Sequence, residues 1–173
     1  MDMLQPTHFV DERSTPYATS IDFCRALTEE LDSLYLLSLL LTADNDKAEQ
    51  CFVSAIGECG EGTGVFMEWA CSWARRAVVK HAIRMIRPAP EHADSLPFVS
   101  LNGPATSPGN NTFATIVALS AFERFVFVMS ILEERSEQDC AILLRCSRRD
   151  VMMARVLALT RLARTDADGF MQA

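Results

Sequence analysis

The sequence has no long apolar run. Its most apolar stretch, residues 34–43, covers about ten residues and is interrupted by Ser38, whereas a membrane-spanning helix needs about 20. The first twenty residues carry several charged side chains and no apolar segment of the kind that a secretion signal requires. We therefore expect a cytoplasmic protein with no membrane partner.

Motifs for catalysis and metal binding are also missing. The sequence holds no Gly-rich phosphate loop, no nucleophile elbow, no HExxH motif and no carboxylate pair at catalytic spacing. The six cysteines form no CxxC pair and have no close pair of histidines beside them. We expect buried free thiols, no metal site, no cofactor, no catalytic residue and no small-molecule substrate.

Positive charge is scarce overall, with 16 basic residues against 23 acidic ones and a net charge of -7. Such a balance normally argues against binding to nucleic acid. The charge is unevenly spread, however: residues 1–88 carry a net -5, residues 89–118 a net -2, and residues 119–173 a net 0. Residues 69–88 and 140–164 each hold a local excess of five positive charges. We call these two segments the first and the second basic island.

Helical periodicity dominates the chain, and no strand pattern is visible. Apolar residues recur at helical spacing over residues 20–41, 47–56 and 65–86, and again from about residue 113 to residue 163. A Gly-rich segment at 57–64 is expected to be a loop. We predict an all-α fold of two small helical domains joined by a Pro-rich linker. The predicted parts are an N-terminal arm at 1–19, a domain at 20–88, the linker at 89–116, a second domain at 117–165 and a tail at 166–173.

Two serines in the second domain predict helix starts. Ser136 precedes Asp139 by three residues, and Ser147 precedes Asp150 by the same spacing, which is an acidic variant of the capping box. Two caps eleven residues apart leave a short helix, a tight turn at 145–147 and a longer helix to about Arg164. This layout is typical of a helix-turn-helix.

Each basic island places several cations on one helix face. Arg76, Lys80 and Arg84 share a narrow face at about 100° per residue, and Arg148 and Arg155 share another. These faces have two interpretations. They are either solvated helix surfaces or contacts to nucleic-acid phosphates.

The C-terminal segment 127–162 resembles, without gaps, the promoter-reading domain of bacterial RNA polymerase sigma factors of the extracytoplasmic-function type. That family has a Ser-capped helix, an Ile/Leu-Leu-Gly-Cys/Val-Ser turn, and a recognition helix after the second Ser. The residues of this chain that fall in the matching places are Ser136, Ala141, Leu143, Leu144, Cys146, Ser147 and Val151.

The N-terminal part resembles the other domain of the same family. Residues 46–50 (Asp-Lys-Ala-Glu-Gln) are similar to the segment that precedes the contact with the polymerase clamp. Residues 66–76 are similar to the Phe-x-x-Trp-Leu-x-x-Ile-Ala-Arg-Asn helix, which in the family reads and melts the upstream edge of the −10 element. The resemblance implies a transcription initiation factor that binds core RNA polymerase and promoter DNA, and an anti-sigma protein is a further candidate partner.

The resemblance also implies roles for particular residues. Arginines at the start of a recognition helix read guanine bases, so the expected DNA contacts of the second island are Arg148, Arg149 and Arg155, with Arg145 near phosphate. The expected contacts to the DNA backbone near the −10 element are Arg76, Lys80 and Arg84. The expected polymerase contacts are Glu49, Gln50 and Val53.

Several positions depart from the family pattern and keep a second hypothesis open. Arg145 replaces the turn Gly and must adopt the turn with a side chain attached. Met152 and Met153 stand in a stretch where the family carries a Lys and an Arg; we expect one of the two to be buried and the other to be free for a groove contact. Trp69 and Trp73 are expected to be core residues. The alternative function is a degenerate sigma-like interaction module that binds polymerase or a regulator without reading promoters.

Overall fold

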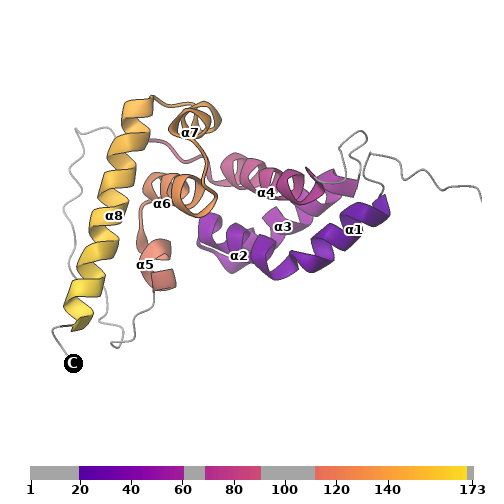
Figure 1. Cartoon of the computed structure of the whole chain (residues 1–173), viewed down its shortest axis with the longest axis horizontal. Coiled ribbons are helices and arrows are strands. Elements are labelled where there is room, and N and C mark those ends of the chain that lie inside the picture. The colour runs from indigo at the N-terminus through magenta and orange to yellow at the C-terminus, as the bar shows by residue number, and fades with distance from the viewer. Residues whose placement is uncertain (1–19, 61–68, 91–111, 171–173) are drawn as a thin grey trace, which may run out of the picture.

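The computed structural model describes residues 20–60, 69–90 and 112–170, and within these ranges the regular elements are all helices (Figure 1). The prediction of an all-α fold is confirmed. The elements are α1 (Ser20–Glu29), α2 (Leu31–Thr42), α3 (Asn45–Gly60), α4 (Ala70–Ile86), α5 (Thr112–Ala118), α6 (Ala121–Phe127), the π-helical turn η2 (Val128–Leu132), α7 (Glu137–Leu144) and α8 (Arg148–Phe170).

The first four helices pack against one another, with α2, α3 and α4 in mutual contact and α1 against α3 and α4 (Figure 1). The inner face of α4 is made of small side chains, because Ala70, Ala74, Ala77 and Ala82 are all at most 4 % exposed. Small residues let helix backbones approach closely. Leucines of α2, such as the buried Leu41, fill the remaining space.

The boundaries of the first three helices differ from the predicted ones. The apolar stripe over 20–41 predicts one helix, yet the chain bends at Glu30 (φ −104°, ψ 8°), and this bend separates α1 from α2. Helix α3 begins at Asn45, because the Asp44 Oδ1 accepts a hydrogen bond from the Lys47 amide at 2.9 Å. It then continues through Gly57, which was expected to open a loop; Gly57 is exposed and its backbone fits the helix. Residues 61–64 of that expected loop lie outside the described residues.

The C-terminal helices surround a strongly apolar segment formed by α6 and η2. Every residue from Phe122 to Met129 is buried, which an ordinary helix with one inner face does not permit. Helix α8 covers α6 on one side, and α2 and α7 contact the segment elsewhere. The π-turn closes with the Glu133 amide donating to the Val128 carbonyl at 2.9 Å. Helix α5 already begins at Thr112, inside the segment 89–116 that we expected to be linker.

A buried arginine joins the two groups of helices. Arg124 of α6 is 6 % exposed, and its guanidinium donates to the Leu41 carbonyl at 3.3 Å, to Val117 at 3.1 Å and to Leu119 at 2.9 Å. Burial lowers the pKa of Arg124 from its ordinary value. The buried apolar residues likewise form one continuous cluster from Leu34 in α2 to Ala158 in α8. The packing of α2 against α5, α6 and η2 is therefore both apolar and hydrogen-bonded.

The described cysteines are free thiols, as expected, but not all of them are buried. Cys51 and Cys140 are fully buried, and burial raises the pKa of each to about 11. Cys24 is exposed, so the expectation of a buried thiol is wrong there. Among the described residues there is no cluster of His, Cys, Asp and Glu that could hold a metal ion.

Candidate nucleic-acid interface

The start of α8 is fixed by its cap. The Asp150 amide donates to Ser147 Oγ at 3.1 Å, and the Ser147 amide donates to Asp150 Oδ2 at 3.0 Å, so both predicted partners of this capping box are in place. Ser136 caps α7 in a similar way, accepting from the Asp139 amide at 3.1 Å. These hydrogen bonds fix the direction of α8 relative to the chain that precedes it.

The turn between α7 and α8 contains a left-handed residue. Arg145 has φ 54° and ψ 45°, and its amide donates to the Ile142 carbonyl at 3.3 Å. The expectation that this arginine adopts a glycine-like turn is confirmed. A residue with a Cβ adopts this conformation at a cost of about 1–2 kcal/mol. The Arg145 side chain is exposed at the end of α7.

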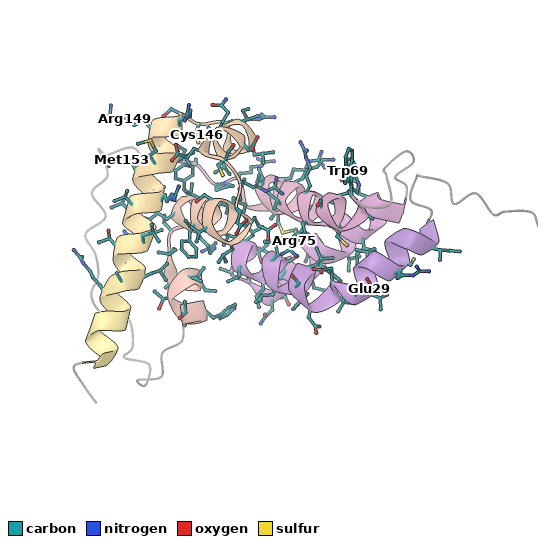
Figure 2. The ribbon with its side chains drawn as sticks, in the orientation of Figure 1. Glu29, Trp69, Arg75, Cys146, Arg149 and Met153 are labelled. Carbon is teal, nitrogen blue, oxygen red and sulfur yellow. The ribbon has the colours of Figure 1, made fainter. Side chains whose placement is uncertain are left out.

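Two of the predicted DNA-contacting arginines share one carboxylate. Arg148 Nη2 and Arg155 Nη1 each lie 3.7 Å from an oxygen of Glu137, which is the first residue of α7. These separations are too long for hydrogen bonds, and the arginine side chains are 64 % and 40 % exposed, so the pairs are weak. Arg149 forms no ion pair with any described residue, and Figure 2 shows it near Met153 at the start of α8.

The exposed face of α8 is apolar on the C-terminal side of Arg148 and Arg149. Met152 is 51 % exposed, Val156 60 % and Leu159 42 %, and their spacing of four and three residues places them in one stripe, which we call the α8 stripe. Met153 is also exposed, so the expectation that one of the two methionines is buried is wrong. The reason is that α8 packs inward through Val151, Ala154 and Ala158, and neither methionine lies on that face.

The first basic island is divided between ion pairs and solvent. Lys80 and His81 both contact the carboxylate of Glu58, with His81 Nε2 at 2.8 Å from Oε2. The hydrogen bond from Lys80 is the main cause of the lowered pKa of Glu58, and His81 adds to it. Arg76 and Arg84 are exposed and pair with no carboxylate among the described residues. Three residues were predicted to contact the DNA backbone: Arg76, Lys80 and Arg84. Among the described residues, Lys80 has an acidic partner and the two arginines have none.

Arg75, in the same island, points the other way and joins distant parts of the chain (Figure 2). Its Nη2 and Nε lie 3.0 and 3.2 Å from the two carboxylate oxygens of Glu133, which follows η2. Its Nη1 donates to Glu30 Oε2 at 3.1 Å and to Ser33 Oγ at 2.9 Å. This arrangement could not be predicted from the sequence, because the acidic partners lie 45 and 58 residues away along the chain.

Both tryptophans lie at the surface, so the expectation of two core tryptophans is wrong. Trp69 is 55 % exposed and Trp73 is 37 % exposed. The inner face of α4 is occupied by Ala70 and Ala74, each one position further along the chain, and one position rotates a side chain about 100° around the helix. Figure 2 shows Trp69 projecting away from the neighbouring helices.

The predicted polymerase contacts come together on the surface of α3. Glu49, Gln50 and Val53 are all exposed and line an open hollow of about 550 Å³ with Asp46, Ser54 and, from α4, Met85. The rim is acidic, and Val53 is 60 % exposed. This combination of an apolar side chain and two carboxylates is suited to a partner surface that is partly apolar and partly basic.

Comparison with known proteins does not identify a family for this chain. Neither the scan against models of protein families nor the search of curated proteins finds a match. In the part of the chain that the structure describes, no helix is long and apolar enough to cross a membrane. Inferences about function therefore rest on the residues and their arrangement.

Proposed function

We propose that this protein is a sigma-like transcription initiation factor, which binds core RNA polymerase and directs it to promoter DNA. The observation that carries the proposal is the capped pair α7–α8, with its turn at Arg145 and with arginines at the exposed start of the second helix. This is the layout in which a helix-turn-helix presents its recognition helix to the major groove.

The proposed DNA contacts fall on the two basic islands. Arg148 and Arg149 lie in the first turn of α8, from which a recognition helix reaches base edges. Arg155 lies about two turns further along, on the same face as Arg148. Each arginine that pairs with a guanine contributes about 1–3 kcal/mol. Arg145, exposed in the turn, would contact a phosphate. Arg76 and Arg84, with Lys80 once it leaves Glu58, would hold the DNA backbone near the −10 element.

Polymerase binding is assigned to the hollow on α3 lined by Glu49, Gln50 and Val53. The net charge of -7 supports a division of labour between the two partners. An acidic protein approaches DNA poorly on its own, because most of its surface repels phosphate. Tethering to polymerase raises the local concentration of DNA around the two islands and removes that barrier.

A pull-down with core RNA polymerase, followed by run-off transcription on genomic fragments, tests this proposal. We expect the full-length protein to be retained by core enzyme and to give discrete transcripts. Arg148→Ala combined with Arg149→Ala should keep polymerase binding and reduce retention of promoter DNA by about tenfold or more. Absence of any polymerase binding would overturn the proposal, and unchanged DNA retention in the double variant would overturn the assignment to α8.

A second candidate function is an interaction module that binds polymerase or a regulator without reading promoters. The α8 stripe favours it, because Met152, Val156 and Leu159 occupy positions where a base-reading helix carries polar groups. The pairing of Arg148 and Arg155 with Glu137 favours it as well. Polymerase binding without transcripts on any fragment, together with loss of partner binding in Val156→Glu, would support this function over the first.

A further inference from the structure

A cavity of about 270 Å³ lies where the end of α3, the middle of α4 and α7 meet. Trp73, Arg76 and Lys80 of α4 form one wall at a spacing of three and four residues, and Glu58 of α3 lies beside them. Leu143 of α7 also lines the cavity, so the C-terminal helices contribute to it as well. Its volume is slightly below the usual range for small-molecule sites, about 300–1,000 Å³, so it suits a small ligand.

The lining offers a flat ring surface and one available positive charge. The indole of Trp73 is 37 % exposed, which leaves part of its ring open to a stacking partner. Lys80 and Glu58 pair with each other, so their charges largely cancel. Arg76 pairs with no carboxylate among the described residues, and its planar guanidinium can bind an anionic group or stack on a ring. The remaining lining is apolar, from Leu143 and the small residues of α4.

We propose that this cavity binds a small molecule consisting of a planar aromatic ring with a single negative charge. The ring stacks on Trp73 and packs against Leu143, and the anionic group pairs with Arg76. A ligand with two negative charges is less suitable. Because Lys80 is neutralised by Glu58, Arg76 supplies the remaining positive charge of the lining. Two kinds of small molecule have this chemistry, namely aromatic carboxylates and cyclic mononucleotides.

A bound ligand would contact both groups of helices. Trp73 and Arg76 belong to α4, whereas Leu143 belongs to α7. Arg75, next to Arg76 on α4, also binds Glu133, which lies on the segment before α7. A ligand that contacts Trp73, Arg76 and Leu143 together therefore favours the arrangement in which these three residues line one cavity. The inference does not depend on polymerase or promoter binding.

Tryptophan fluorescence of the full chain tests the site directly. The sequence has two tryptophans, so Trp69→Phe leaves Trp73 as the sole reporter. The probes are two matched pairs, nicotinate with nicotinamide and cyclic AMP with adenosine, in which the second member lacks the charge. We expect saturable quenching by at least one charged probe and binding about tenfold weaker for its neutral partner. Quenching by nicotinate alone identifies the carboxylate class, and quenching by cyclic AMP alone identifies the nucleotide class.

Variants in the same background separate the site from non-specific effects. Arg76→Gln should weaken the charged probe about tenfold and bring it close to the neutral one, whereas Arg25→Gln removes an exposed charge on α1 and should change nothing. Leu143→Ala should weaken both members of a pair, and a thermal melt confirms that it folds. Linear, unsaturable quenching by all four probes, or an Arg76→Gln protein that binds as tightly as its parent, would overturn the proposal.

Discussion

The two basic islands look alike in the sequence but differ in the proportion of their cations that the structure pairs with acidic side chains. In the first island, Arg75 forms four hydrogen bonds to distant groups and Lys80 pairs with Glu58. In the second island, Arg161 pairs closely with the buried Glu123, whereas Arg149 is exposed. Arg148 and Arg155 lie 3.7 Å from a carboxylate that they share. A local excess of positive charge therefore contains both structural cations and cations that are available to a partner.

The difference arises from acidic residues that are far away in the sequence. Glu133 is 58 residues from Arg75, and Glu58 is 22 residues from Lys80, so a window that counts local charge misses both. Glu137 lies only 11 residues before Arg148, yet it stays too far away for a hydrogen bond. Charge counting locates a basic surface, and tertiary packing decides which of its members remain free.

The largest effect is expected for the most buried arginine, Arg124. Arg124→Ala should lower the free energy of unfolding by about 3 kcal/mol, because the carbonyls of Leu41, Val117 and Leu119 lose a charged donor. Arg124→Met keeps the apolar stem and should cost somewhat less. Urea unfolding with an unchanged m value measures both. The exposed counterpart Arg149→Ala should stay within about 0.5 kcal/mol of the parent, and equal losses for both residues would contradict the division into structural and available cations.

A comparison of neighbours on α4 sharpens the same distinction. Arg75→Gln should cost about 2 kcal/mol, because Glu133 keeps its charge in a poorly exposed position with no partner, its side chain being 7 % exposed. Arg76→Gln, one residue later, should cost less than about 0.5 kcal/mol. Thermal unfolding of the two variants side by side is sufficient. Similar melting temperatures would show that the Arg75 contacts contribute no more than a solvated charge does.

In the second island, one arginine is strained rather than paired. Arg145→Gly should stabilise the protein by about 1 kcal/mol, since glycine adopts φ 54° without the penalty that a Cβ brings. Arg145→Ala is the matched control and should give no such gain, because alanine keeps the Cβ. A gain in the alanine variant equal to that in the glycine variant would trace the effect to lost charge repulsion instead.

The smallest effect concerns Glu58, the acidic partner of Lys80 in the first island. The pKa of Glu58 is lowered from its ordinary 4.5, so its pairing with Lys80 and His81 stabilises the fold above pH 4.5 and is lost as the pH falls through the lower folded value. The pair is partly exposed, and we expect only about 0.5 kcal/mol. Denaturation at pH 6 and pH 3 should show a smaller decrease in stability for Glu58→Gln than for the parent. An identical decrease in both proteins would assign the acid sensitivity to other carboxylates.

Much of the fold could be predicted from local patterns. The all-α class, the end of α4 before Pro88, and the caps at Ser136 and Ser147 follow from periodicity and from hydrogen bonds within three residues. The bend at Glu30 could not be predicted, because the apolar stripe continues through it. The course of α3 through Gly57 was missed for the opposite reason, since an exposed glycine is tolerated inside a helix.

The candidate interface was predicted only in part. The exposure of Arg149 and the gathering of Glu49 and Val53 agree with the arrangement expected from the sequence. The exposure of Trp73 differs from the expected arrangement, because bulky aromatic residues are expected in a core. The sequence does not show that alanines already fill the inner face of α4. Arg124 was overlooked although it interrupts the apolar run 122–129, and such an interruption is the signal that could have found it.

In the proposed DNA complex, Glu137 is the anionic group that a phosphate would replace. It presents two carboxylate oxygens to Arg148 and Arg155, much as a strand of DNA would present two phosphate oxygens, so the proposed DNA contact is an exchange of one anion for another. Salt weakens the pairing with Glu137 as well as the pairing with DNA. Fewer solution ions are then released on binding than the number of arginines suggests, and the affinity for DNA should fall less steeply with salt than for a variant with Glu137→Gln.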